Sequence, residues 1–72
     1  MPRSPELPSA KVFSALRARI EAGEWQPDQA LPSVAVLAAE YGASRATVAR
    51  VLRKLEADGL VRVIPRWGTF RS

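Results

Sequence analysis

Arginine and hydroxyl side chains follow one another closely between Ser44 and Arg53. A guanidinium can donate two hydrogen bonds to O6 and N7 of guanine, which makes Arg45 the best candidate for reading a base. Arg50 and Arg53 are expected to bind phosphates, contacts that position a protein without specifying a sequence. For Thr47 two roles are open: a contact to a base, a thymine methyl or a phosphate, or a local cap of the helix start. The chemistry that these residue types predict is binding of a duplex nucleic acid.

These side chains act together only if residues 44–58 form a helix with one free face. The apolar residues recur with i, i+3, i+4, i+7 spacing, which is typical of a stripe that faces a core: Val48, Val51, Leu52 and Leu55. At 100° per residue the opposite side holds small and basic residues: Ala46, Ala49, Arg50 and Arg53. Small alanines such as Ala46 permit close approach, so this segment is predicted to be a recognition helix that enters the major groove.

A second helix is expected just before this one, from Ser33 to Tyr41. The two helices are joined by so few residues around Gly42 that they must cross steeply, so residues 33–54 are predicted to form a helix-turn-helix. Ser33 and Ser44 are expected to cap their helices, while the free backbone amides at each helix start face a phosphate. The same pattern would also build an ordinary orthogonal helix pair that binds no nucleic acid.

Residues 61–71 predict a hairpin, because the short β-branched run 61–64 is followed by a turn and a second extended run. We expect it to pack on the helices through Val61, Val63 and Phe70. Its turn, residues 65–68, projects Arg66 and Trp67 and suits a minor groove, where a cation meets enhanced negative potential. The Trp67 ring has an alternative position, folded back onto the domain surface.

The remaining elements place this unit in one small domain. Residues 1–8 hold three of the six prolines and are expected to be a flexible arm. Residues 10–22 carry an apolar stripe and predict a first helix, capped by Ser9 and ended by Gly23. The segment 24–32 is expected to be a loop with one short strand, pinned to the core by Trp25 and Leu31. The predicted class of residues 9–72 is mainly α with a small β-hairpin: a winged helix-turn-helix with a three-helix core plus a wing.

Composition narrows the function further. The chain has 72 residues, 47% of them hydrophobic, and a net charge of +4. Residues 41–72 hold seven basic and two acidic residues, whereas residues 1–40 hold four and five, and such asymmetry suggests that one half meets a polyanion. With no cysteine or histidine, disulfides, the usual zinc sites and histidine bases are excluded, so we expect no enzyme, metal or cofactor. No apolar run is long enough for a membrane span and no secretory signal is visible, which makes the cytoplasm the expected compartment.

The order of these motifs resembles the N-terminal winged-helix domain of the GntR family of bacterial transcription regulators. The resemblance covers residues 9–70 and is carried by Gly23-Glu24, Leu31-Pro32-Ser33, the run 41–48 (YGASRATV), Asp58-Gly59-Leu60-Val61 and Gly68-Thr69-Phe70. It implies binding to a double-stranded DNA operator, with Ser44, Arg45 and Thr47 as contacts from the recognition helix and Gly68 at a wing tip near the minor groove. Two positions depart from the family pattern, because Ala35 and Ala49 stand where basic residues are common.

The resemblance also implies partners for the whole protein. Family members usually continue into a larger C-terminal domain that binds a small-molecule effector and forms a homodimer, so we expect this chain to be a fragment of a regulator, with repression the commoner outcome. Two other readings stay open. A winged helix can serve as a protein-protein interaction module, with Trp67 as an anchor, or it can bind structured RNA by charge and shape.

Overall fold

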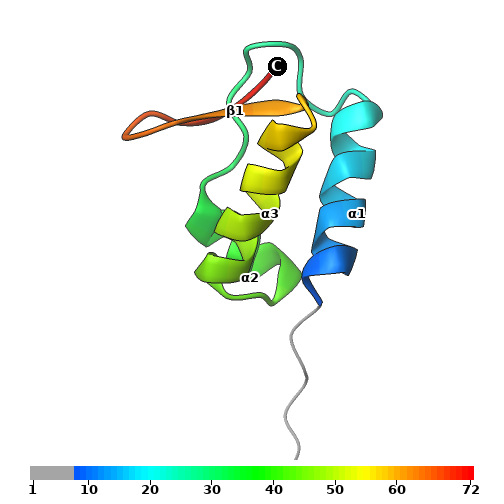
Figure 1. Ribbon diagram of the computed structural model, residues 1–72, viewed down its shortest axis with the longest axis vertical. Coiled ribbons are helices and arrows are strands. Elements are labelled where there is room, and N and C mark those ends of the chain that lie inside the picture. Colours follow the sequence, from blue (N-terminus) through cyan, green and yellow to red (C-terminus); the bar gives the residue numbers. More distant parts are fainter. Residues whose placement is uncertain (1–7) are drawn as a thin grey trace, which may run out of the picture.

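The computed structural model describes residues 8–72, which form three helices and one antiparallel hairpin (Figure 1). The elements are α1 (Ser9–Glu21), α2 (Val34–Tyr41), α3 (Arg45–Ala57), β1 (Val61–Ile64) and β2 (Gly68–Arg71). This order confirms the predicted class, mainly α with a small β-hairpin. The predicted arm, residues 1–8, lies outside the described residues except for Pro8.

α1 packs through the stripe that its sequence predicts, with Val12, Leu16 and Ile20 fully buried. The helix begins one residue earlier than expected. Pro8 is its N-cap, and the Pro8 carbonyl accepts from the amides at positions 11 and 12 at 2.9 and 3.1 Å. The predicted Ser9 cap is therefore wrong: Ser9 is already the first helical residue, one position too late for its hydroxyl to serve the first turn.

The connection between α2 and α3 needs only residues 42–44. Gly42 has a φ of 61°, a left-handed conformation that costs a residue with a side chain roughly 1–2 kcal/mol. This turn lets the Ala43 amide donate to the Ala38 carbonyl at 2.9 Å, which satisfies an acceptor in the last turn of α2. Ser44 then starts α3, so the predicted helix-turn-helix is present with the predicted caps.

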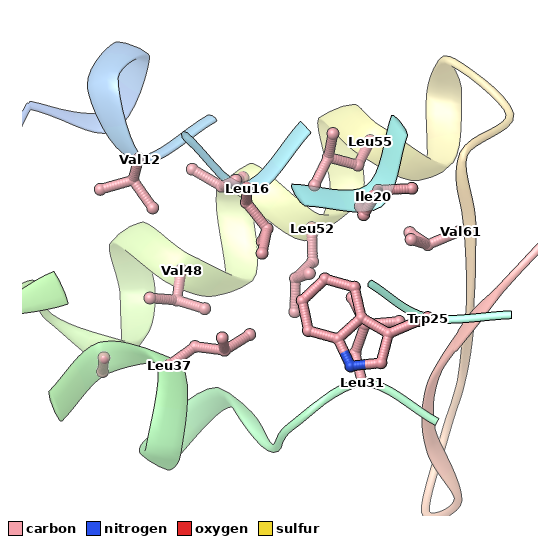
Figure 2. Close-up of a cluster of buried hydrophobic side chains, with 12 residues drawn as sticks. Val12, Leu16, Ile20, Trp25, Leu31, Leu37, Val48, Leu52, Leu55 and Val61 are labelled. Atoms are coloured by element: carbon pink, nitrogen blue, oxygen red, sulfur yellow. The ribbon is translucent and has the colours of Figure 1, made fainter. Parts of the chain in front are cut away.

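The hydrophobic core lies between α1, α2 and α3 and is closed by the connection after α1. Figure 2 shows the Trp25 ring beside Leu31, among side chains from all three helices. Trp25 is 6% exposed and Leu31 7%, which confirms that both pin this connection to the core. Burying a side chain of this size contributes about 1.5–3 kcal/mol, so the core supplies most of the stability of so short a chain. The largest fully buried residues are Leu16, Ile20, Leu37, Leu55, Val12, Val48, Val51 and Val61.

Arg19 joins three parts of the fold, a role that the sequence did not predict. Its guanidinium carbon lies 4.9 Å from the centroid of the Trp25 ring and 5.9 Å from that of Tyr41. The same group donates to the Glu24 carboxylate at 2.6 and 2.8 Å, to the Tyr41 hydroxyl at 2.8 Å and to Glu40 at 3.1 Å. α1, the connection after it and α2 are thereby held around one side chain.

β2 is the middle of a small sheet. On one side it pairs with β1 in antiparallel register, from Val61 opposite Arg71 to Ile64 opposite Gly68. On the other side it binds the connection between α1 and α2 through a bridge between Ala30 and Phe70, which is all that forms of the short strand expected in residues 24–32. The base of the hairpin is therefore fixed from both edges.

The hairpin packs on the helices only at this base. Val61 is 1% exposed and belongs to the core, as expected. Phe70 is partly buried, but it pairs with Ala30 in the connection and is not among the side chains packed on the core. Val63 is 37% exposed, so its predicted packing is wrong. The physical reason is the direction of β1: after Val61 the strand leaves the bundle, and the hairpin projects on the side away from α1 (Figure 1).

Candidate nucleic-acid interface

One face of α3 is left free by the fold. Its apolar stripe is buried, with Val48, Val51 and Leu55 fully enclosed, while Arg45, Arg50 and Arg53 are exposed. α1 packs against the buried side. Arg50 and Arg53 lie on the opposite side of the helix, as helical spacing predicts, and Arg45 lies at the flank of the first turn. Ala49, predicted on the free face, is half-buried.

The arginines divide into two groups by their ion pairs. Those of α1 are neutralised within the fold: Arg17 pairs with Glu21 and Asp58, and Arg19 pairs with Glu24 and Glu40. Within residues 8–72, no ion pair is formed by the cations of α3 and of the hairpin turn, which are Arg45, Arg50, Arg53, Lys54 and Arg66. Lys11 and Arg71 also form no ion pair within residues 8–72, so five of the seven unneutralised cations there lie on α3 and the hairpin tip.

The start of α3 is organised by Ser44. The Ser44 hydroxyl oxygen accepts a hydrogen bond from the Thr47 amide at 3.1 Å. The same hydroxyl donates a hydrogen bond to the Thr47 hydroxyl oxygen at 2.9 Å. Thr47 is half-buried and takes part in the local cap. The amides of Arg45 and Ala46 have no acceptor within the helix and point out of its positive end, toward the place where an anion is most favoured. Ser33 makes the corresponding cap on α2, accepting from the Val36 amide at 3.2 Å.

The hairpin tip is a tight turn with a cation and an aromatic ring. The Trp67 amide donates to the Ile64 carbonyl at 3.0 Å across Pro65 and Arg66. Arg66 has a φ of 70°, which is the conformation of the third residue in a type II turn, and proline suits the second. Trp67 is 79% exposed, which excludes the alternative in which its ring folds back onto the domain.

Two acidic residues support the hairpin, and the sequence did not point to either. Glu56 on α3 accepts from the Val63 amide at 2.9 Å, on the edge of β1 that does not pair with β2. Asp28 pairs with Arg62 at 2.7 Å, so Arg62 is engaged within the fold. The only available signal was that Glu56 is one of two acidic residues in the basic half of the chain.

The resolved pKa shifts lie outside this interface. The pKa of Arg19 is raised, first by its hydrogen bond with Glu24 and then by that with Tyr41, and Arg19 in turn lowers the pKa of the Glu24 carboxyl. In the described part of the chain no group of acidic, cysteine or histidine side chains is placed to hold a metal ion, and no pocket is enclosed. No helix there is both long and apolar enough to cross a bilayer.

All the residues predicted to contact DNA lie at the surface, in three places. The start of α3 holds Ser44, Arg45, Ala46 and Thr47, its later turns hold Arg50 and Arg53, and the hairpin tip holds Arg66, Trp67 and Gly68. Ser33 is exposed at the start of α2. Thr47 is the only one of these residues that is not fully exposed.

Comparison with known proteins gives one family and many relatives. The family described as "Bacterial regulatory proteins, gntR family" matches residues 8–70. The chain is 41% identical over 70 residues to the histidine utilization repressor of Klebsiella aerogenes, covering 96% of this chain and 29% of that protein. It is 39% identical over 62 residues to the HTH-type transcriptional repressor NagR of Bacillus subtilis, covering 86% and 26%. The chain thus spans less than a third of the length of these relatives.

Solved structures agree in fold. The DNA-binding domain of AraR in complex with operator ORX1 superposes with a TM-score of 0.86 at 28% identity, covering all of this chain and 93% of that one. The same domain in complex with operator ORE1 gives a TM-score of 0.86 at 31% identity, covering 99% and 90%. The three helices and hairpin described above are therefore the architecture of a domain that has been seen on operator DNA.

Proposed function

The chain belongs to the gntR family of bacterial regulatory proteins, and on this premise we propose that residues 9–72 are the sequence-specific DNA-binding domain of a transcription regulator, most simply a repressor. The observation that carries the proposal is the free face of α3. α3 exposes three arginines that form no ion pair within residues 8–72, Arg50 and Arg53 on the free face and Arg45 at the flank of the first turn, and this unneutralised charge attracts phosphates.

The proposed contacts follow from where each residue lies. The first turn of α3 enters the major groove, where Arg45 reads guanine and Thr47 contacts a base or a thymine methyl beside the small Ala46. Arg50 and Arg53 clamp phosphates, and the capped starts of α2 and α3 at Ser33 and Ser44 each offer backbone amides to a phosphate. The wing, residues 65–68, reaches an adjacent minor groove, where Arg66 meets the strongest negative potential.

The relatives that this chain matches are longer than the chain itself. Because this chain covers under a third of the repressors that it matches, we propose that the whole regulator works as a homodimer on two operator half-sites. The dimer contacts and a small-molecule effector site are assigned to a C-terminal domain outside these residues. The proposed location is the cytoplasm, on the nucleoid.

The exposed Trp67 ring supports one other candidate, a protein-protein interaction module. Exposed aromatic residues often anchor protein contacts, and a basic surface suits an acidic partner. Binding to DNA is favoured because cations without an ion pair lie on α3 as well as on the hairpin. A protein anchor at the hairpin tip would need only the cation on the hairpin.

The deciding experiment is titration of labelled duplex DNA at several salt concentrations. The probe is the duplex that the wild-type chain enriches from a pool with a randomised centre, compared with an unselected duplex of equal length. Contacts to about five phosphates predict that log K falls with log salt at a slope of about −4 to −5. Equal weak binding to both duplexes would contradict sequence-specific recognition.

Arg17→Ala is the matched control. It removes the same charge as the variants of α3, but from an α1 residue that is already paired with Glu21 and Asp58. Its affinity for the selected duplex should stay close to that of the wild type. A loss equal to that of Arg50→Ala would show that binding follows net charge and not the free face of α3.

A further inference from the structure

Trp67 is the most exposed of the large hydrophobic residues in the described part of the chain, at 79%. Burial of such a side chain would stabilise the fold, a gain that the domain leaves unused. The hairpin projects away from α1 (Figure 1), and most of Trp67 is left open to solvent. The ring is thus fully available to a binding partner.

The tip also holds its residues in one arrangement. Pro65 fixes one backbone angle, and the hydrogen bond from the Trp67 amide to the Ile64 carbonyl closes the turn. Arg66 occupies a position with positive φ that usually selects glycine, so the turn is strained there. A cation is therefore kept next to Trp67 in the sequence of a turn that would be more relaxed with glycine, and the backbone of both residues has little conformational freedom left to lose.

The dimensions of the hairpin decide what can enter a groove. Three strand residues separate the buried Val61 from the turn, so the tip reaches roughly 10 Å beyond the packed base. A minor groove is about 6 Å wide and 7.5 Å deep, whereas paired strands lie about 4.8 Å apart before side chains are added. With the van der Waals width of the strands added, roughly 3.5 Å, the backbone of the hairpin is about 8 Å across and too wide to enter, whereas a flat ring roughly 3.5 Å thick is not.

The residues around the Trp67 ring favour a binding partner that is a polyanion and that also has apolar surfaces in its interior. Residues 61–72 contain three arginines and no acidic residue. Ile64, 37% exposed, lies opposite Gly68 in the register, so no side chain of β2 stands across from it. The hairpin tip thus exposes two apolar side chains, Trp67 and Ile64, together with the charged Arg66. Sugar rings and base edges in a minor groove, flanked by phosphates, have the matching chemistry.

We propose that Trp67 acts as an apolar wedge in the minor groove, with Ile64 beside it and Arg66 as the electrostatic anchor, and that it bends the DNA at a flexible step next to the site read by α3. This inference rests on the proposed function. Apolar side chains inserted from the minor groove partly unstack a base step and kink the duplex by about 20–90°. Pyrimidine-purine steps such as TA unstack most easily, so Trp67 would select them through deformability without reading hydrogen bonds.

The first test follows the Trp67 ring itself. In Trp25→Phe the ring of Trp67 is the sole indole, and saturation with the selected duplex is expected to quench its fluorescence and protect it from acrylamide. Because Trp25 is buried and stacked on Arg19, this variant can lose stability. The difference between wild type and Trp67→Phe, in which only Trp25 remains, gives the same information without altering the core.

The second test measures bending, as energy transfer between dyes at the two ends of the selected duplex. Wild type is expected to shorten the end-to-end distance, and Trp67→Ala to restore that of free DNA with roughly 10-fold weaker binding, the scale of one lost aromatic stack. Trp67→Lys adds a cation while removing the ring, so it separates charge from insertion. Its added charge should make it bind more tightly than Trp67→Ala, yet it should bend the DNA no more than that variant.

The base step gives a third readout. Replacing the TA step at the flank by AA should weaken wild type and leave Trp67→Ala unchanged. If the duplex binds specifically while Trp67 stays open to acrylamide and the DNA stays straight, the wedge is overturned and the proposed function stands. If no duplex binds specifically, both are overturned, and Trp67 is then better explained as an anchor for a protein.

Discussion

At the scale of single residues, the arginines of α3 have similar exposure but different consequences. Arg45 lies in the first turn, where side chains reach base edges, whereas Arg53 lies two turns later, where the helix faces the phosphate backbone. A base contact affects one position of the operator, and a phosphate contact affects all duplexes alike. The two roles can therefore be separated by experiment.

Arg45→Ala is expected to lower the discrimination at one guanine of the selected duplex by about 1–3 kcal/mol, because the bidentate contact is lost. Arg53→Ala should instead weaken binding to all duplexes and reduce the salt slope by about 1. Competition with single-base variants of the selected duplex measures the first effect and salt titration the second. Equal effects of both variants on every sequence would exclude a base contact by Arg45.

Glu24 gives a residue-scale prediction for pH. Because Arg19 lowers its pKa in the folded protein, ionised Glu24 stabilises the fold at pH values above its unfolded pKa, about 4.3. This contribution is lost as the pH falls through the lower pKa of the folded state. Urea unfolding should therefore show Glu24→Gln to be less stable than wild type at pH 6, with the difference shrinking below about pH 4. A difference independent of pH would show that the charge of Glu24 does not matter.

At the scale of elements, the two helices of the helix-turn-helix, α2 and α3, each depend on a serine cap. The Ser44 hydroxyl serves both the amide and the hydroxyl of Thr47. Ser44→Ala is expected to lower the free energy of unfolding by about 1 kcal/mol, and Ser44→Gly by only a few tenths, because glycine exposes the amides to water. Urea unfolding measures both. If Ser44→Ala were as stable as wild type, the hydrogen bonds of Ser44 would be irrelevant to the start of α3.

The hairpin depends on Glu56, which binds the outer edge of β1. Glu56→Ala should speed hydrogen exchange at the Val63 amide and leave the amides of the core helices slow, since the core does not include this contact. Glu56→Gln keeps an acceptor oxygen and serves as the control, with exchange near that of wild type. Exchange by NMR is the suitable measurement, because DNA affinity would also respond to the lost negative charge. Unchanged exchange at Val63 in Glu56→Ala would contradict the role.

The elements that could be predicted are those fixed by local sequence. Apolar spacing located α1, α2 and α3, and Gly42 with Ser44 located the tight turn, because helix stops and caps act within a few residues. The contacts that join elements could not be predicted, namely those of Arg19, Glu56 and Asp28. Their partners lie on other elements, and the path of the chain decides which elements come together. The predicted packing of Val63 was wrong for the same reason. Alternation of apolar residues gives the face of a strand, but not the point at which the strand leaves the core.

At the scale of the whole molecule, charge and packing are separated. The arginines of α1 are paired and the connection around Trp25 is closed by Arg19, whereas the cations of α3 and the wing form no ion pair within residues 8–72. The candidate contact residues could be proposed from the sequence because none of them belongs to an apolar stripe that predicts the core. Their individual partners on DNA were not, because a sequence shows which side chains are free and not which base each one meets.

The separation also affects how the molecule can be changed. Residues 62–68 are exposed, and the hairpin is held by Val61 and Thr69 at its base. The three residues of the turn, 65–67, can therefore be replaced without disturbing the packed base of the hairpin. Libraries that vary positions 66 and 67 alone should yield folded proteins with altered preferences for flanking DNA, which offers a route to retargeting without redesign of the helices.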